Sequence, residues 1–377
     1  MDGEKRLEEK VEKQKGFVRV IVLFFAGCMM CIGAIGFTDA HKTAGKDVIT
    51  EDKQLSNQFC QIIDKVFETG WVEDDNGKYY YKDGLLSFGW QTVDGDTYYF
   101  DENGLMVKDK MVEKNKYVGS DGKLVPLEEL AEYEKEGLSD LKKELQKDVG
   151  GYRGTWSIYV KNLDTNEYMS IGEEQINSAS LIKLYNMATV YDEIEKGNLE
   201  KDDGVTRYLH DMITVSDNGA YNHLLSILGE GNLKAGIELV TEFCEENGYD
   251  NTGCGGTLSS SETGFPSIWL FTNYTSTADC GHLLENIYRG LLVSEDASEE
   301  MLSLLKQQQW RTKIPAGLPE DVICANKTGE YGARQHDAAI VYSDGADYII
   351  TVMTDGDGAA ISHIQKVSSI VYEYFND

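Results

Sequence analysis

An uninterrupted apolar stretch near the start of the chain constrains its organisation more than any other feature. It covers 21 residues from Phe17 to Phe37, and Arg19 is the only charged residue within it. As a helix rising about 1.5 Å per residue, it would span roughly 31 Å, the thickness of a bilayer core. Basic residues precede it, so the positive-inside rule leaves residues 1–16 in the cytoplasm. We predict a transmembrane signal anchor at 17–37, a cell-membrane location and an extracellular position for the rest of the chain.

Two other interpretations of this stretch stay open. A cleaved signal peptide has an apolar core of about 7–15 residues, which is shorter than this stretch, and no clear cleavage site follows. A lipoprotein-type site from Phe25 to Cys28 would place a lipid on Cys28, but apolar residues continue for nine positions beyond it. A membrane-spanning anchor fits the length best.

Charge and cysteine content exclude several classes of protein. The chain has 35 basic and 65 acidic residues, a formal charge of −30, so no nucleic-acid partner is expected. Because the histidines are scattered and no Cys-x-x-Cys pair follows the apolar stretch, we predict neither a metal site nor a cofactor. An odd number of cysteines follows that stretch, and their spacing leaves any disulfide pairs open. These cysteines are Cys60, Cys244, Cys254, Cys280 and Cys324.

Aromatic residues recur at a period near 20 between positions 70 and 125. Trp71 and Trp90 stand 19 residues apart, and Tyr80 and Tyr99 each follow nine positions later. Such a period is typical of a solenoid of short hairpins, in which each unit packs its aromatic side chains against the next. This stretch resembles the cell-wall-binding repeats of choline-binding type on Gram-positive surface proteins. The resemblance implies that these four residues bind choline or another wall polymer by cation–π attraction. A structural stalk whose aromatic residues only pack is the open alternative.

Apolar and polar patterning predicts a mixed domain over residues 126–377. Strands at both of its ends, with helices between them, predict one antiparallel sheet built from both termini of the domain. Helices would cover both sides of this sheet, which makes the fold class an α/β (α+β) sandwich. The expected elements are a helix at 127–149, strands at 155–160, 168–171, 322–326, 338–342 and 348–353, and a helix at 360–375.

The whole chain then divides into five parts. These are a cytoplasmic N-terminus at 1–16, a transmembrane helix at 17–37, a linker at 38–69, an all-β hairpin-repeat module at 70–125 and the mixed domain at 126–377.

Three short strings in the mixed domain carry the candidate chemistry. The first, Ser180-Leu181-Ile182-Lys183, opens an apolar helical run, so the hydroxyl and the amine share one helix face. Burial would lower the pKa of Lys183 and let it act as a base toward Ser180. The other two strings are Ser216-Asp217-Asn218, which precedes a helix, and Lys327-Thr328-Gly329, which ends an expected strand.

Each string also has a purely structural interpretation. The first would be a helix cap with a solvated lysine, the second an N-cap and the third a turn. What favours catalysis is the order of all three strings in suitable settings, which chance does not readily produce. The first spacing alone is weak, since it also occurs at Ser120/Lys123, Ser139/Lys142 and Ser303/Lys306.

With these strings, residues from about 130 to 377 resemble the penicillin-recognising serine hydrolases, and most closely the class A β-lactamases. The resemblance implies that Ser180 is the acyl-accepting nucleophile and that Lys183 activates it. Ser216 would relay a proton to the leaving nitrogen. The backbone N–H groups of Ser180 and Glu330 would form the oxyanion hole.

The same resemblance implies a set of substrate-binding residues. Asn218 would hold the side-chain amide of the substrate, whereas Lys327 and Thr328 would bind its carboxylate. Gly329, without a side chain, would let the substrate backbone lie against the strand. The implied substrates are β-lactams or peptidoglycan peptides at a Gram-positive type of cell surface.

One part of the class A pattern is missing. Those enzymes carry a Glu-x-x-Leu-Asn string, whose Glu positions the water that releases the acyl group. Between Cys254 and Tyr274 the single Glu is Glu262, and Pro266 stands where the Asn should be. Glu262 is kept as a candidate catalytic residue, with an ordinary loop carboxylate as the alternative.

Acylation of Ser180 is therefore predicted, and deacylation is left open. Three hypotheses follow for the chain. It is a class A-like β-lactamase, or a peptidoglycan D-Ala-D-Ala peptidase or β-lactam-trapping protein with slow deacylation, or a non-catalytic wall-binding or sensory protein.

Overall fold

The structure is a computed structural model that describes residues 69–377, apart from 75, 114–115, 173–174, 260–262 and 377. The predicted anchor at 17–37 and nearly all of the predicted linker lie outside the described residues. Among the helices that are described, none is long and apolar enough to cross a membrane. Two compact units divide the chain close to residue 127, and each is described here by itself.

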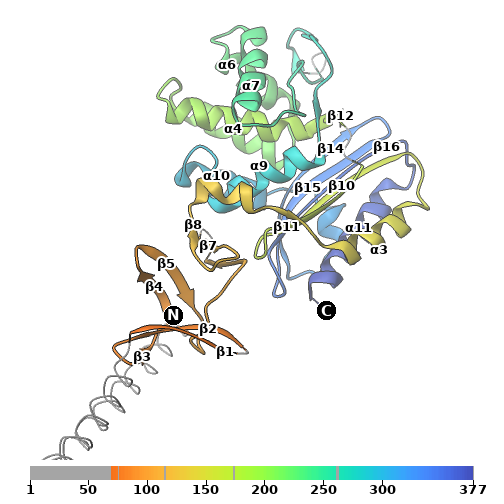
Figure 1. Ribbon diagram of the computed structural model, residues 1–377. Helices are drawn as coiled ribbons and strands as arrows, with labels where there is room; N and C mark the ends of the chain where they lie inside the picture. Colours follow the sequence, from red (N-terminus) through yellow and green to blue (C-terminus); the bar gives the residue numbers. More distant parts are fainter. Residues whose placement is uncertain (1–68, 75, 114–115, 173–174, 260–262, 377) are drawn as a thin grey trace, which may run out of the picture. The chain divides into compact units, whose positions relative to one another are not determined.

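The first unit is built from short antiparallel hairpins (Figure 1). Trp71 on β1 (Gly70–Asp74) pairs with Tyr80 on β2 (Gly77–Lys82), and Trp90 on β4 (Gly89–Val93) pairs with Tyr99 on β5 (Asp96–Phe100). The equal sequence spacing therefore yields an equal strand register in both hairpins. The other strands are β3 (Leu85–Leu86), β6 (Lys110–Glu113), β7 (Lys116–Val118) and β8 (Leu124–Val125).

Glycines at repeating positions let successive hairpins pack closely. Gly104 and Gly122 have φ angles of +78° and +81°, which only glycine adopts without strain. A Cβ on Gly104 would lie 2.6 Å from the side chain of Leu86, and one on Gly122 would lie 2.7 Å from that of Met106. Each glycine thus contacts an apolar side chain from an earlier part of the module. This packing of each hairpin against an earlier one is the predicted solenoid arrangement.

A six-stranded sheet with the order β14-β15-β16-β10-β11-β9 organises the second unit. Strands β10 (Thr155–Asn162) and β11 (Glu167–Ile171) come from the start of the unit. Strands β14 (Ile323–Tyr331), β15 (Arg334–Tyr342) and β16 (Tyr348–Asp355) come from its end. Because β10 pairs with β16, the two termini of the unit meet within the sheet. Neighbouring strands of the sheet are antiparallel, except that β9 (Lys135–Glu136) runs parallel to β11. The predicted antiparallel sheet is therefore confirmed.

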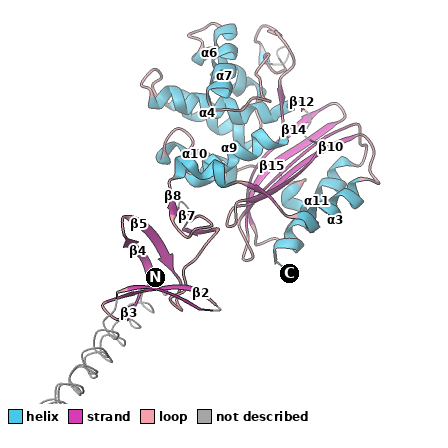
Figure 2. Cartoon of the chain, viewed as in Figure 1, coloured by secondary structure: helices cyan, strands magenta, loops and turns pink. Residues whose placement is uncertain are grey.

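Helices cover both faces of this sheet, as Figures 1 and 2 show. Ile158 and Val160 of β10 belong to one core with α3 (Ser139–Val149) and α11 (Ala360–Asn376), whereas Tyr159 belongs to the larger core on the other face. The alternation follows from the period of two along a strand. Helices of the larger core are α4 (Ile182–Glu195), α5 (Asp203–Thr214), α6 (Asn218–Leu228), α7 (Leu233–Glu246), α9 (Thr277–Arg289) and α10 (Glu295–Lys306).

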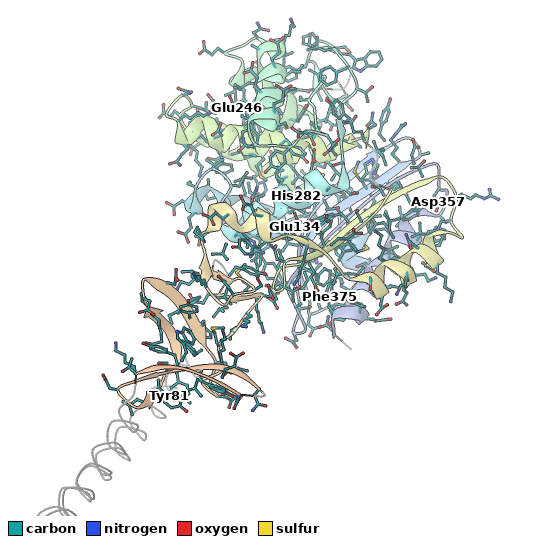
Figure 3. All side chains as sticks on the ribbon, viewed as in Figure 1. Tyr81, Glu134, Glu246, His282, Asp357 and Phe375 are labelled. Carbon is teal, nitrogen blue, oxygen red and sulfur yellow. The ribbon has the colours of Figure 1, made fainter. Side chains whose placement is uncertain are left out.

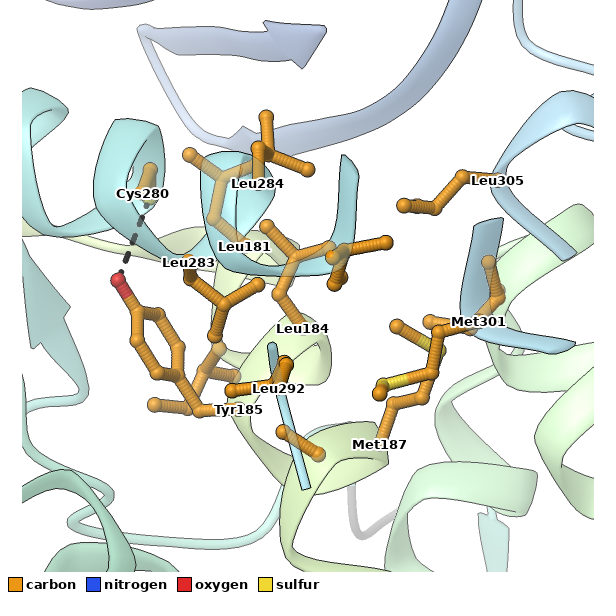
Figure 4. Close-up of a cluster of buried hydrophobic side chains, with 14 of the residues drawn as sticks. Leu181, Leu184, Tyr185, Met187, Cys280, Leu283, Leu284, Leu292, Met301 and Leu305 are labelled. Carbon is orange, nitrogen blue, oxygen red and sulfur yellow. Dashed lines mark hydrogen bonds between the residues drawn. The ribbon is translucent and has the colours of Figure 1, made fainter. Parts of the chain in front are cut away.

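Helix α4 runs through the middle of the larger core. Every residue from Ile182 to Tyr191 is buried, so the helix has no exposed face over that stretch. Leu184 and Met187 are completely buried in a cluster with Met301 of α10 (Figure 4). The first turn of α4 is therefore held rigidly, and with it the residue Lys183.

A buried ion-pair network joins β10 to α9 and to the segment that enters the unit. Lys161 Nζ lies 3.1 Å from Glu134 Oε1 and 2.5 Å from Glu285 Oε2. His282 lies beside Glu134 at 3.6 Å (Figure 3). Burial opposes ionisation of Glu134, but its hydrogen bond with His282 and the charge of Lys161 outweigh burial and lower its pKa to about 2. Glu134 therefore stays ionised inside this network.

Two predicted element boundaries are wrong. Residues 127–149 do not form one helix, because η1 (Leu127–Tyr133) gives way to β9, whose pairing with β11 interrupts the helical pattern before α3. The Lys327-Thr328-Gly329 string does not end its strand. Strand β14 continues to Tyr331, which pairs with Arg334 of β15. Pairing with the distant β11 overrides the local pattern in the first case, and pairing within the β14–β15 hairpin extends the strand in the second.

Four cysteines of the second unit are free thiols, namely Cys244, Cys254, Cys280 and Cys324. All four are buried. Burial raises the pKa of Cys254 to about 11 and that of Cys280 to about 12. Thiols of this kind are poor nucleophiles at neutral pH. Cys60 lies outside the described residues.

Candidate active site

Ser180 lies on η2 (Ala179–Leu181), a short turn between β12 (Ile176–Asn177) and α4. Ala179 has a φ of +45°, a backbone conformation that costs a non-glycine residue about 1–3 kcal/mol. Asn177 Oδ1 accepts a 2.9 Å hydrogen bond from the Ala179 N–H and helps to hold this turn. A Cβ on Gly329 would lie 3.3 Å from Ser180 N, so the turn packs directly against β14. A larger residue at 329 would require the turn to shift by a few tenths of an ångström.

Lys183 is completely buried, and its Nζ reaches across to the second string. It donates hydrogen bonds to Ser216 O at 2.6 Å, Asn218 Oδ1 at 2.7 Å and Ser216 Oγ at 3.3 Å. Burial, assisted by the nearby positive charge of Lys327, holds the pKa of Lys183 well below its ordinary value. A neutral amine at this point can accept a proton.

The structural interpretation of the second string holds for Asp217, whereas Ser216 contacts the buried amine of Lys183. Asp217 is the N-cap of α6, because its side chain accepts a 2.6 Å hydrogen bond from Ala220 N. Ser216, just before it, has a φ of +60°, and its hydroxyl contacts Lys183. The cap thus orients the first turn of α6, so that Ser216 and Asn218 both contact the buried amine.

Lys327 approaches the same hydroxyl from β14. Its Nζ donates hydrogen bonds to Ser216 Oγ at 2.8 Å and to Thr328 O at 2.7 Å. Burial lowers the pKa of Lys327 to about 7, with Asp337 opposing the shift and Lys313 adding to it. The hydroxyl of Ser216 therefore lies between two amines whose pKa values are both lowered by burial.

The structure brings the predicted residues of all three strings together. Lys183, Ser216, Asn218 and Lys327 share a continuous set of hydrogen bonds, and Gly329 lies against Ser180. Within the described part of the chain, Lys183 directs its hydrogen bonds to the second string and none to Ser180. Thr328 and Glu330 lie on the same edge strand, β14.

The loop after Cys254 places a hydroxyl group at the site. Asn218 Nδ2 donates a 2.9 Å hydrogen bond to Ser259 Oγ. Asn222 accepts from Leu258 N at 3.0 Å and donates to Leu258 O at 2.7 Å, which ties the loop to α6. Glu262 lies outside the described residues, and the described residues from Cys254 to Tyr274 include no carboxylate side chain. The role predicted for Glu262 stays a prediction.

Sequence reasoning missed Ser259 and Asn222. Asn222 follows Asn218 by four residues, a spacing that places both amides on one helix face and was available as a signal. Ser259 offered no such signal, because its contact depends on how the loop folds back onto α6.

The aromatic residues predicted to bind the cell wall form two clusters in the first unit. Trp71 lies 5.2 Å from Tyr80 and 4.9 Å from Tyr98, measured between ring centres. Trp90 lies 5.1 Å from Tyr99. The Nζ of Lys116 lies 5.2 Å from the centre of the Trp90 ring, so a cation of the protein itself already occupies one face of that ring.

Fold and site together define a domain of the β-lactamase-like serine hydrolase type. A family model described as the Beta-lactamase enzyme family matches residues 140–208 and 204–375, which together exceed half of the chain. The chain therefore belongs to that family. Models of a choline-binding repeat and of a putative cell wall binding repeat match residues 88–124 and 69–84.

Solved structures share the fold of the second unit. PBP-A is 24% identical, with a TM-score of 0.56 over 64% of this chain and 98% of that one. A mutant of PBP-A, solved as an acyl-enzyme complex with penicillin G, is also 24% identical, with a TM-score of 0.56 over 63% and 97% of the two chains. A mutant of the class A β-lactamase of the last common ancestor of Gram-negative bacteria is 21% identical, with a TM-score of 0.54 over 63% and 98%. Comparison with curated proteins finds no match.

Proposed function

We propose that the second unit is a serine hydrolase that opens β-lactams by forming a covalent acyl-enzyme on Ser180. One observation carries the proposal: the hydroxyl of Ser216 lies 3.3 Å from the buried amine of Lys183 and 2.8 Å from that of Lys327. This arrangement provides a proton path from a base near Ser180 to a group that can protonate a leaving nitrogen.

Acylation would proceed along this path. The Ser180 oxygen attacks the lactam carbonyl carbon, and its proton passes to the neutral amine of Lys183. The proton then moves through Ser216 to the lactam nitrogen as the C–N bond breaks. Negative charge on the carbonyl oxygen is stabilised by the N–H groups of Ser180 and Glu330, which bring preorganised dipoles to the point where charge develops.

Substrate binding would use the edge of β14. Lys327, when protonated, pairs with the substrate carboxylate together with the Thr328 hydroxyl. Asn218 would receive the side-chain amide of the substrate. Its own amide is already held by Lys183 and Ser259, so it enters the reaction preoriented.

A second candidate function is a peptidoglycan D-Ala-D-Ala peptidase or a β-lactam trap with slow deacylation. The favouring observations are the missing Glu-x-x-Leu-Asn string, with Pro266 where its Asn should be, and the Ser259 hydroxyl that lies on Asn218. A hydroxyl is a far weaker base for water than a carboxylate, so the acyl-enzyme would persist. The PBP-A mutant, which shares this fold, was observed as an acyl-enzyme with penicillin G.

We place the reaction outside the cell, on a chain anchored by residues 17–37 and held near the wall by the repeats at 70–125. The apolar length of the first segment supports the anchor, and the repeat models support contact with the wall. Substrate, anchor and repeats then all point to the peptidoglycan layer.

The test uses the full-length protein beside a Ser180→Ala variant. Each is incubated with a chromogenic cephalosporin and, separately, with a fluorescent penicillin. Steady turnover that the variant lacks supports a β-lactamase, whereas a stable label without turnover supports the trap or peptidase. A protein that neither turns over the first reagent nor retains the second lacks the proposed function.

A further inference from the structure

Lys313 is a further buried lysine, and it lies against β14, the strand that carries Lys327-Thr328-Gly329. Lys313 directly precedes η3 (Ile314–Gly317), and its side chain is completely buried. Its Nζ donates hydrogen bonds to the carbonyl oxygens of Gly329 at 3.2 Å and His336 at 3.1 Å. It also lies 2.9 Å from Glu330 Oε1. One ammonium group therefore binds three acceptors on two neighbouring strands.

These contacts determine the direction of the peptide between Gly329 and Glu330. Gly329 and His336 lie opposite each other in the β14–β15 ladder. In such a pair, either each carbonyl points toward the partner strand or each points away from it. A single nitrogen contacts both oxygens, so the Gly329 carbonyl points toward β15. In a trans peptide the Glu330 N–H then points the other way, to the unpaired edge of β14.

The carboxylate of Glu330 creates an electrostatic problem at this point. The N–H of the same residue is the expected second donor of the oxyanion hole. A negative side chain close to a developing oxyanion raises the energy of the transition state. Lys313 offsets this charge, because its ammonium pairs with the carboxylate from the buried side even though Glu330 is 58% exposed. The cation on the Gly329 carbonyl also polarises the peptide and strengthens the Glu330 N–H as a donor.

We propose that Lys313 is a positioning residue of the oxyanion hole, which orients the Gly329–Glu330 peptide and neutralises the Glu330 carboxylate. The assignment rests on the proposed function, since an oxyanion forms only when Ser180 is acylated. Lys313 does not take part in the proton path, because its contacts lie on β14 and β15 and not on Ser216.

The experiment is a double-mutant cycle on the full-length protein. Single-turnover reaction with a fluorescent penicillin separates the dissociation constant of the non-covalent complex from the acylation rate constant. Lys313→Met should lower the acylation rate constant about 10²-fold, as expected for loss of one oxyanion donor. The dissociation constant should change less than about threefold, because the lost interaction acts mainly in the transition state.

The second half of the cycle isolates the charge. Glu330→Gln alone should slow acylation less than Lys313→Met does, since the backbone N–H stays and Lys313 already neutralises the carboxylate. In that background the loss caused by Lys313→Met should shrink about tenfold, because no carboxylate is left to neutralise. Lys313→Gln, which keeps one hydrogen-bond donor, should recover part of the rate and serves as the second variant if the methionine protein does not fold.

Lys161→Met is the matched control. Like Lys313→Met, it removes a buried ammonium group that pairs with a glutamate. Lys161 lies on β10, however, and strands β15 and β16 separate β10 from β14. It should lower the melting temperature without slowing acylation per folded molecule. Wild-type acylation by both Lys313 variants, or equal slowing by Lys161→Met, would overturn the assignment alone. If the wild-type protein neither retains the label nor hydrolyses a β-lactam, the proposed function fails and this assignment fails with it.

Discussion

Lys327 donates a 2.8 Å hydrogen bond to the hydroxyl of Ser216, and it does so as a buried amine whose pKa burial lowers to about 7. The ammonium form, which in the proposed function binds the substrate carboxylate, is therefore lost as pH rises through about 7. Burial holds the pKa of Lys183 well below its ordinary value, which favours the neutral amine that the proposed base needs. In the proposed function, Lys327 is the cation and Lys183 is the base.

The first prediction concerns this division. The second-order rate constant for acylation by a β-lactam should fall as pH rises above about 7 in the free enzyme. Lys327→Arg should remove this fall, since a guanidinium stays charged up to a pH of about 12. The measurement is the pH profile of acylation from pH 5 to 10. An unchanged decline in the arginine variant would assign that limb to another group.

The loop provides the second prediction. Ser259→Glu would place a carboxylate beside Asn218, where it can activate water. The acyl-enzyme should then decay about 10²-fold faster, which is the usual contribution of a general base. Ser259→Gln is the matched control, of equal size but without a base, and it should decay at the wild-type rate. Equal decay in all three proteins would show that this position does not control deacylation. The measurement is the lifetime of the covalent label that a fluorescent penicillin leaves on each protein.

The third prediction concerns stability in acid. His336 is buried, with Thr354 N donating to Nδ1 at 3.2 Å and Asn177 O lying 2.9 Å from Nε2. Burial lowers its pKa to about 4, from an ordinary value of 6.5. Below pH 6.5 the unfolded chain binds a proton that the folded chain refuses, so the free energy of unfolding falls as pH falls toward 4.

His336→Gln should remove this dependence while keeping one donor and one acceptor. Relative to the variant, the wild type should lose up to about 3 kcal/mol between pH 6.5 and 4. Urea unfolding at half-unit pH steps measures the difference. Asp337, whose pKa burial raises to about 6, is present in both proteins and cancels in that difference. A difference that does not vary with pH would contradict the account.

The fourth prediction concerns the repeats. Because the Lys116 ammonium lies over the Trp90 ring, a quaternary ammonium ligand has to displace it to use that face. Lys116→Ala should therefore tighten retention of the full-length protein on a choline column. Trp71→Ala should weaken retention, since Trp71 forms the cluster with Tyr80 and Tyr98. If wild type and both variants pass through unretained, the repeats are a stalk.

The reach of the sequence in the second unit depends on how local each signal is. The order of Ser180, Ser216 and Lys327 predicted a shared site, and Lys183 and Lys327 do meet at the Ser216 hydroxyl. Apolar patterning likewise predicted β10 and β16. Each of these patterns lies within or next to a single helix or strand, and that element is buried. A local pattern is therefore enough to predict it.

Contacts between distant segments were beyond such reasoning. Lys313 belongs to no motif, and its role depends on the Gly329 and His336 carbonyls on two strands that come later in the chain. The interrupted helix at 127–149 has the same cause, because β9 pairs with β11 across the intervening α3 and β10. Only the assembled sheet brings these groups together.

Mass spectrometry of the full-length protein after incubation with benzylpenicillin tests the central claim most directly. The account predicts one covalent adduct per chain, which proteolysis places on the peptide containing Ser180 and which Ser180→Ala lacks. An adduct on another residue, or a folded protein that neither carries an adduct nor hydrolyses benzylpenicillin, would contradict it.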